Sequence, residues 1–166
     1  MKKTLLSLAM GLSMLTLTGT AQATDLLFER YFAGKTTATG SFSAINGVKR
    51  NFDVDLTGRW NGKTLVLRED FVFSDGEKDT KTWRFTKTGE GRYTGTREDV
   101  IGTTDVVIDG KTARFTYLVN IGTAAKPNRV RFHDTMVLQP DGRVINTAWV
   151  TKYLFPVAKT RVVFSR

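Results

Sequence analysis

The stretch that decides the fold is residues 49–73, KRNFDVDLTGRWNGKTLVLREDFVF. On either side of Asn61-Gly62, apolar and polar residues alternate with the period of two that is typical of half-buried strands. Asn-Gly is favoured in two-residue hairpin turns because both positions adopt positive φ there. The stretch therefore predicts two antiparallel strands, over 49–60 and 64–73, that share one apolar face.

The alternation also predicts which side chains face the core. Glu69 is the single charged residue on the apolar face of this hairpin. A three-residue loop with Gly76 in the left-handed conformation keeps the next strand in the register that pairs Trp83 with Leu67. The same register sets Glu69 opposite Lys81, inside the fold and near one end.

Similar strand and turn patterns continue to the C-terminus. Threonine, valine and aromatic residues are enriched, and turn residues recur about every ten positions. Before the strands, apolar residues spaced by three and four predict a short helix over 25–32 that Asp25 caps. The expected strands are 36–44, 49–60, 64–73, 78–87, 92–99, 103–109, 111–120, 129–139, 143–152 and 157–165.

Consecutive short strands in up-and-down order leave two long edges unless the sheet closes on itself. We therefore predict an all-β fold, an antiparallel up-and-down meander that closes into a lipocalin-like (calycin-like) barrel of about 8–10 strands. An open sandwich is the alternative. The interior of such a barrel is either filled with side chains or open to one small ligand, and both possibilities stay open at this point.

Residues 1–23 have the pattern of a cleaved secretory signal peptide. Two lysines precede an uncharged apolar segment from Leu5 to Leu17, and Ala21-Gln22-Ala23 provides the small-x-small cleavage pattern. The apolar segment is too short for a transmembrane anchor. We expect cleavage after Ala23 and a single β-barrel domain over 24–166, exported to the periplasm as a soluble protein without a transmembrane segment.

The composition excludes several classes of protein. The chain has no cysteine, which excludes disulfides, thiolate metal sites, a cysteine nucleophile and a lipid-bearing cysteine. Its net charge of +9 favours anionic partners such as a lipid surface. Basic residues are spread over many strands without the stripe that nucleic-acid binding requires. We expect no nucleic-acid partner, and a monomer.

The sequence offers little catalytic chemistry. His133 is the only histidine, and its neighbour Asp134 projects to the opposite face of the strand. No serine lies in a G-x-S-x-G elbow. Asp53-x-Asp55 imitates the start of a calcium-binding loop, but the twelfth position is Thr64 rather than glutamate. We predict no catalytic residue, no metal site and no cofactor.

Three polar residues are expected to point into the apolar interior, namely Glu69, Asp134 and Asn146. Buried polar groups are costly unless they have partners. One explanation is an internal ion pair of Glu69 with Lys81 together with hydrogen bonds; the other is a set of anchors for the polar head of a ligand. The candidate ligand-binding residues are Glu69, Lys81, Trp83, Tyr117, Asp134 and Asn146.

Two motifs resemble known families. The first, carried by several runs over nearly the whole chain after residue 23, resembles the bacterial envelope family catalogued as domain of unknown function 3833 (DUF3833). These runs are Phe52 to Gly62, Leu67 to Glu77, Tyr93 to Thr96, Asp99 to Gly102, Asp141-Gly142 and Ile145-Asn146. Members of that family are often described as lipoproteins without an assigned activity. This chain lacks the lipid-bearing cysteine, so membrane anchoring is not carried over.

The second motif, Gly58-Arg59-Trp60, is similar to the Gly-x-Trp of lipocalins. The resemblance implies the shape of a ligand-carrying barrel rather than its cargo. We expect a non-enzymatic binder of a small apolar or amphipathic molecule. Two alternatives stay open: an interaction protein of the bacterial envelope that binds anionic lipid or a protein partner, and a small-barrel isomerase or hydrolase with Glu69 or Asp134 as general base.

Overall fold

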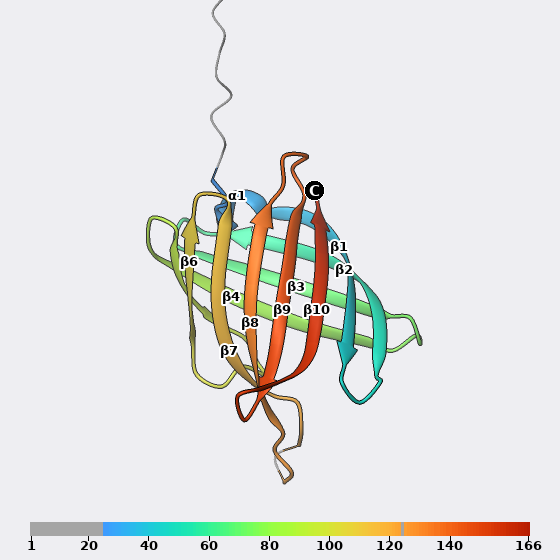
Figure 1. Cartoon of the computed structure of the whole chain (residues 1–166). Helices are drawn as coiled ribbons and strands as arrows, with labels where there is room; N and C mark the ends of the chain where they lie inside the picture. Colours follow the sequence, from blue (N-terminus) through green and yellow to red (C-terminus); the bar gives the residue numbers. More distant parts are fainter. Residues whose placement is uncertain (1–24, 124) are drawn as a thin grey trace, which may run out of the picture.

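The computed structural model describes residues 25–123 and 125–166, which form a short helix and a closed barrel of antiparallel strands (Figure 1). The predicted signal peptide lies outside the described residues. The elements are α1 Phe28–Tyr31, β1 Gly34–Ala44, β2 Lys49–Trp60, β3 Thr64–Phe73, β4 Lys78–Gly89, β5 Arg92–Thr96, β6 Thr104–Asp109, β7 Thr112–Asn120, β8 Arg129–Leu138, β9 Val144–Lys152 and β10 Phe155–Ser165.

The sheet closes as predicted. Strands that follow one another in sequence are neighbours in space, and β1 pairs with β10 from Thr37↔Ser165 to Ala44↔Ala158. Closure pairs both of the edges that an open meander would expose. The lipocalin-like barrel is therefore confirmed, and the open sandwich is wrong.

The predicted facing of the first hairpins is confirmed, but the two-residue Asn61-Gly62 turn is wrong. Trp60 lies opposite Leu65 instead of Lys63, and Gly62 has a positive φ whereas Asn61 does not. On the next pair of strands, Leu67 lies opposite Trp83 and Glu69 opposite Lys81. Because side chains on a strand alternate between faces, this register puts the apolar row inside and leaves Asp53 and Asp55 exposed.

Four boundaries differ from the prediction by two or three residues, and others differ by one. Strand β1 begins at Gly34, two residues before the predicted start. Strand β5 ends at Thr96 instead of residue 99, and Val100 then forms an isolated bridge to Val119. Strand β4 continues to Gly89 through an irregularity after Lys87. Strand β10 begins at Phe155, two residues before the predicted start. Local pairing partners, which the alternation of residue types does not reveal, decide these ends.

The helix α1 is shorter than predicted and is not capped by Asp25. Its N-cap residue is Leu27, which makes no side-chain capping bond. The aromatic residues of this segment instead pack into one end of the barrel, and that burial holds a helix too short to be stable alone. Among the described residues, no helix has the length and apolarity needed to cross a bilayer.

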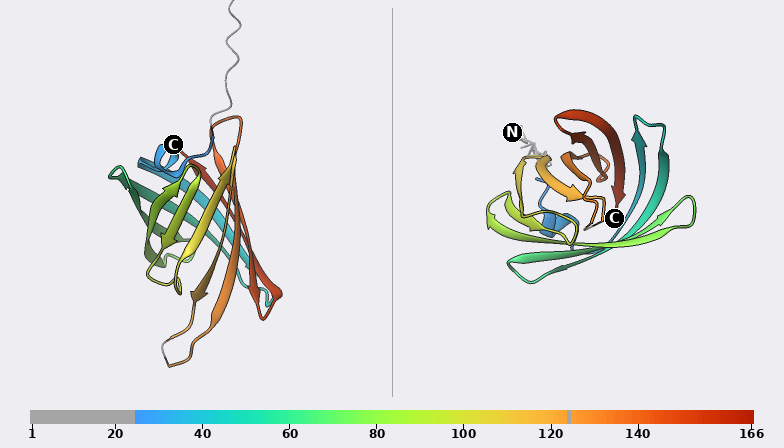
Figure 2. Two further views of the ribbon diagram at one scale, coloured as in Figure 1. Left: turned by 90° about the vertical axis from the view of Figure 1, so that its left-hand side faces the viewer. Right: turned by 90° about the horizontal axis from the view of Figure 1, so that it is seen from below.

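Packing of α1 closes this end of the barrel (Figure 2). The ring of Phe28 packs edge-on against Phe85 and stacks on Tyr93, with centroids 5.0 and 5.3 Å away. Phe32 packs against Phe164 in the same way. The chain comes so close to β2 that a Cβ on Gly58 would lie 1.7 Å from the carbonyl oxygen of Phe32. Only glycine at this position lets the segment close the barrel.

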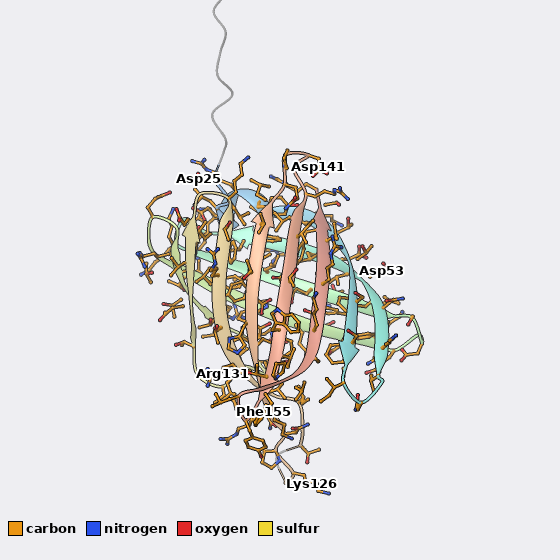
Figure 3. All side chains as sticks on the ribbon, in the orientation of Figure 1. Asp25, Asp53, Lys126, Arg131, Asp141 and Phe155 are labelled. Carbon is orange, nitrogen blue, oxygen red and sulfur yellow. The ribbon has the colours of Figure 1, made fainter. Side chains whose placement is uncertain are left out.

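The hairpins β7–β8 and β9–β10 project from the opposite end of the barrel (Figure 1). Figure 3 shows Phe155, Lys126 and Arg131 at this end, and Asp25 and Asp141 at the end that α1 covers. We call these the open end and the α1 end.

Candidate functional site

The interior of the barrel contains a cavity of about 130 Å³. A dry cavity of about this size in another protein accommodates benzene, so the space suits a ring-sized or short alkyl group. Its walls are mainly aromatic. The aromatic residues are Phe28, Phe32, Phe52, Phe71, Trp83, Phe85, Phe115, Tyr117, Phe132 and Phe164.

The cavity approaches solvent on the side away from α1. Beside the helix, the lining residues Phe28, Phe32 and Phe85 are buried. Toward the open end, the lining residues Phe52 and Phe132 are only half-buried. This gradient indicates that the cavity is more accessible from the open end, and the view along the barrel in Figure 2 shows α1 at the far side.

Asp134 and Asn146 bring polar groups into this apolar space. Asp134 is on β8 and Asn146 on β9, and they lie diagonally because Asn146 pairs with Met136. The two side chains are 5 and 8% exposed. The amide Nδ2 of Asn146 donates a hydrogen bond to Oδ1 of Asp134. As predicted, Asp134 points inward and the exposed His133 points outward, between Thr116 and Thr151.

This pair leaves two oxygens without partners. Neither Oδ2 of Asp134 nor Oδ1 of Asn146 has a hydrogen bond of acceptable length and angle within the described residues. Burial raises the pKa of Asp134 to about 6, against the lowering effects of the Asn146 amide, the Arg97 charge and the nearby Tyr117 phenol. An unpaired buried acceptor costs free energy unless a hydrogen-bond donor reaches it.

Glu69 is the second carboxyl group of the cavity wall. It is buried on β3, and burial raises its pKa to about 7. The positive charge of Arg97 opposes this rise, whereas the negative charge of Asp134 adds to it. Near neutral pH both carboxyl groups are therefore partly protonated, whereas carboxyl groups with ordinary pKa values are ionised.

Arg97, which the sequence analysis did not single out, also lines the cavity. Its guanidinium lies over the ring of Trp83 at 4.7 Å and over that of Tyr117 at 5.4 Å. Its Nε donates to Oδ1 of Asp99 at 2.6 Å. The alternation Tyr93, Gly95, Arg97 was the available signal, since it places all three on the inner face.

The predicted ion pair between Glu69 and Lys81 is wrong. Although the two residues lie opposite each other, the Lys81 ammonium pairs with Asp79 at 3.2 Å and Asp99 at 3.4 Å. The early end of β5 turns Asp99 toward Lys81, and these carboxylates are better solvated than Glu69. Glu69, which points inward, therefore forms no ion pair with the lysine opposite it on β4.

Most of the predicted ligand-binding residues come together in the cavity wall. Glu69, Trp83, Tyr117, Asp134 and Asn146 line it, and Lys81 does not. Their role in binding stays a prediction. Among residues 25–123 and 125–166, no group of three or more His, Asp or Glu side chains is placed to hold a metal ion.

Comparison with known proteins agrees with the barrel. The sequence profile of the family described as "Protein of unknown function (DUF3833)" matches residues 7–166. The S-type phycobiliprotein lyase CPES from Guillardia theta superposes with a TM-score of 0.55 at 8% identity, over 82% of this chain and 88% of the lyase. This likeness concerns the fold alone.

A de novo designed fluorescence-activating β-barrel superposes with a TM-score of 0.42 at 10% identity, over 84% of this chain and 97% of the design. No curated protein matches the chain significantly in sequence.

Proposed function

Because this chain belongs to the DUF3833 family of proteins of unknown function, which assigns no activity, we propose a function from the cavity: the protein is a non-enzymatic carrier of one small amphipathic molecule in the periplasm. The observation that carries the proposal is the pair of unpartnered oxygens, Oδ2 of Asp134 and Oδ1 of Asn146, on the wall of an aromatic cavity. A ligand donor would satisfy both oxygens and recover the free energy that their isolation costs.

The charges of the wall favour a ligand whose polar end donates hydrogen bonds. An amine or alcohol can donate to Asp134 and Asn146, whereas a carboxylate would meet the like charges of Asp134 and Glu69. Arg97 offers little compensation to an acid, since its guanidinium is already bonded to Asp99 and stacked on Trp83. We therefore assign the ligand to the amines and alcohols rather than the fatty acids.

The order of groups along the barrel favours entry with the polar end first. Asp134 and Asn146 are deeply buried, whereas the aromatic rings of Phe52 and Phe132 toward the open end are half-buried. A ligand that seats its polar end on the buried pair places its apolar part against these rings. The burial of that apolar part provides the main driving force for binding.

The signal-peptide pattern of residues 1–23 supports the periplasmic part of the proposal. Fractionation of the expressing bacterium, with mass spectrometry of the N-terminus, tests it directly. A chain that begins after Ala23 in the periplasmic fraction is expected, and an uncleaved chain in the cytoplasm would contradict the proposal.

The carrier function is tested with three ligands on one skeleton: a phenylalkyl amine, the corresponding alcohol and the corresponding carboxylic acid. The indole of Trp83 lines the cavity, so its fluorescence reports binding, and Trp83→Phe identifies that signal among the three tryptophans. We expect the amine and the alcohol to bind at least about tenfold more tightly than the acid at pH 8, where Asp134 is ionised.

Matched variants locate the binding site. Asp134→Asn should weaken amine binding by about tenfold or more, because a charge-assisted hydrogen bond is lost. Asp70→Asn is the control, since Asp70 is bonded to Arg68 on the outer face of β3. Native mass spectrometry of protein from its own bacterium completes the test. The carrier function would be ruled out if the purified protein contains no bound molecule and binds none of the three probes.

A second candidate function, an isomerase or hydrolase, is favoured by one specific observation. Glu69 and Asp134 share a cavity, and burial raises their pKa values to about 7 and about 6, which suits a general base. Ester cleavage and deuterium exchange next to a ketone, measured with small aromatic probes, test this candidate. Turnover that is lost in a folded Glu69→Gln variant would favour the enzyme over the carrier.

A further inference from the structure

The tip of the β9–β10 hairpin carries consecutive large apolar side chains in full exposure to solvent. Tyr153, Leu154 and Phe155 are 85, 93 and 73% exposed. Tyr153 and Leu154 also have φ values of 49° and 73°, in the left-handed region that glycine usually occupies. The turn therefore holds bulky apolar residues where a glycine would be conformationally easier, and neither burial nor backbone geometry within the described residues explains them.

The tip is part of a wider apolar rim. Most of the large exposed apolar residues lie in the hairpin turns at the open end, and the described turns at the α1 end carry none of them. Rim residues beyond the tip are Ile45, Val48, Ile101 and Ile121. Exposed apolar side chains gathered at one end of a protein are typical of an interaction surface.

Toward the open end, the charged side chains of hairpins β7–β8 and β9–β10 are all basic. The sequence has no Asp or Glu from Val119 to His133 or from Gly142 to Arg166. Figure 3 shows Lys126 and Arg131 at the same end of the barrel as Phe155, and Lys152 donates to Oδ1 of Asn128 at 2.7 Å, which links the two hairpins. The potential at the tip is therefore positive.

The carboxylates at the open end lie on other hairpins and are paired. Asp75 and Glu77 bond to Arg50 at 2.9 and 2.6 Å, and Asp99 bonds to Arg97 at 2.6 Å. Glu98 accepts a hydrogen bond from the backbone N–H of Thr82. These pairs leave the basic charge of the projecting hairpins uncompensated.

We propose that this tip docks on an anionic lipid bilayer, with Tyr153, Leu154 and Phe155 inserted among the head groups and the basic residues of the two hairpins on the lipid phosphates. Two contributions hold a protein on an anionic membrane: the insertion of apolar side chains into the interface and the attraction of surrounding basic residues to the lipid head groups. Charge complementarity selects the bilayer over a protein partner. The docked barrel points its open end at the lipid.

Insertion is tested with an environment-sensitive fluorophore. The chain has no cysteine, so Leu154→Cys gives a single labelling site at the tip. We expect its emission to rise on addition of phosphatidylcholine vesicles that contain phosphatidylglycerol, and to change little with pure phosphatidylcholine. Val107→Cys, at an exposed apolar position on the side of β6, is the matched control and should not respond.

Binding of unlabelled variants to the same vesicles separates the apolar and ionic parts. Leu154→Ser combined with Phe155→Ser should weaken binding at least about tenfold, whereas Val72→Ser with Val107→Ser should not. Lys126→Glu combined with Arg131→Glu should weaken binding and reduce its sensitivity to salt; Lys35→Glu, exposed at the α1 end, should have little effect.

The controls define what would overturn the proposal. The wild-type protein failing to bind phosphatidylglycerol vesicles would overturn it, as would binding that the tip variants leave unchanged. A tip that binds a purified protein but not vesicles would overturn it in favour of a protein interface. Since the experiment uses no cavity ligand, its outcome is independent of the carrier function.

Discussion

The α1 end and the cavity bury carboxyl groups in opposite ways. At the α1 end, Glu29 accepts hydrogen bonds from Lys87, at 2.7 Å, and from the Tyr93 hydroxyl. In the cavity, Asp134 and Asn146 satisfy one another only in part and leave two oxygens without partners. The first arrangement fixes α1 to β4 and β5, and the second carries a free-energy cost that a bound donor would remove.

The pKa values express the same difference. Burial acts to raise the pKa of Glu29, but the hydrogen bonds from Lys87 and Tyr93 outweigh it and the net shift is downward. Burial also dominates at Glu69, and there it raises the pKa to about 7 against the positive charge of Arg97. The pKa values of two glutamates in one barrel thus shift in opposite directions, because Glu69 is more deeply buried and Glu29 has hydrogen-bond donors.

Among the substitutions that test this comparison, Phe28→Ala should lower the stability of the protein most. Phe28 is buried against Phe85 and Tyr93, so its truncation leaves a void at the closed end and should lower the free energy of unfolding by about 4 kcal/mol. Denaturant unfolding measures the loss. Phe52→Ala, at the half-buried side of the cavity, is the control and should cost about half as much. Equal losses would mean that the two ends are packed alike.

Glu69→Gln should change stability in a pH-dependent way. The folded-state pKa of about 7 lies above the ordinary value of 4.5, so the stabilisation by the protonated form is complete below about pH 4.5 and is lost as pH rises through about 7. Relative to the variant, the free energy of unfolding of the wild type should fall by about 3 kcal/mol between pH 4.5 and pH 8. Denaturant unfolding of both proteins across this range measures it. A constant difference would show that folding leaves the pKa of Glu69 unshifted.

Glu29→Gln should have a smaller effect with the opposite pH dependence. Because the folded-state pKa of Glu29 is lowered, its stabilisation is present above about pH 4.5 and is lost as pH falls. The free energy of unfolding of the variant should be lower than that of the wild type by about 1 kcal/mol at pH 7 and by less in acid. Chemical unfolding at pH 7 and pH 4 checks the sign. A variant that is more destabilised in acid would contradict the assigned role of Lys87.

Lys81→Ala should have the smallest effect. The ammonium pairs with the partly exposed Asp79 and Asp99, and such pairs contribute about 0.5 kcal/mol. The titration of Glu69, followed by NMR of its side-chain carboxyl carbon, should be nearly unchanged. A clear upward shift of the Glu69 pKa in the variant would show that Lys81 does pair with Glu69, as the sequence suggested.

Much of the fold could be predicted because its determinants are local. The alternation on either side of Asn61-Gly62 determines which faces of β2 and β3 share the core, and the pairing of Trp60 with Leu65 keeps those faces together. The early end of β5 was not predictable in this way. Residues 97–99 continue the alternation of a strand, but in the fold Ile101 donates its N–H to Leu118 and Val100 pairs with Val119.

The sequence by itself determined that this chain is an antiparallel barrel with Glu69, Asp134 and Asn146 on its inner face. Period-two alternation is a property of neighbouring residues, so it sets the direction of each side chain before the chain folds. Only the tertiary structure decided that Lys81 leaves Glu69, that Arg97 joins the cavity and that two buried oxygens stay unpaired. Those outcomes depend on distances across the closed barrel, where a hydrogen bond is made or lost within a fraction of an ångström.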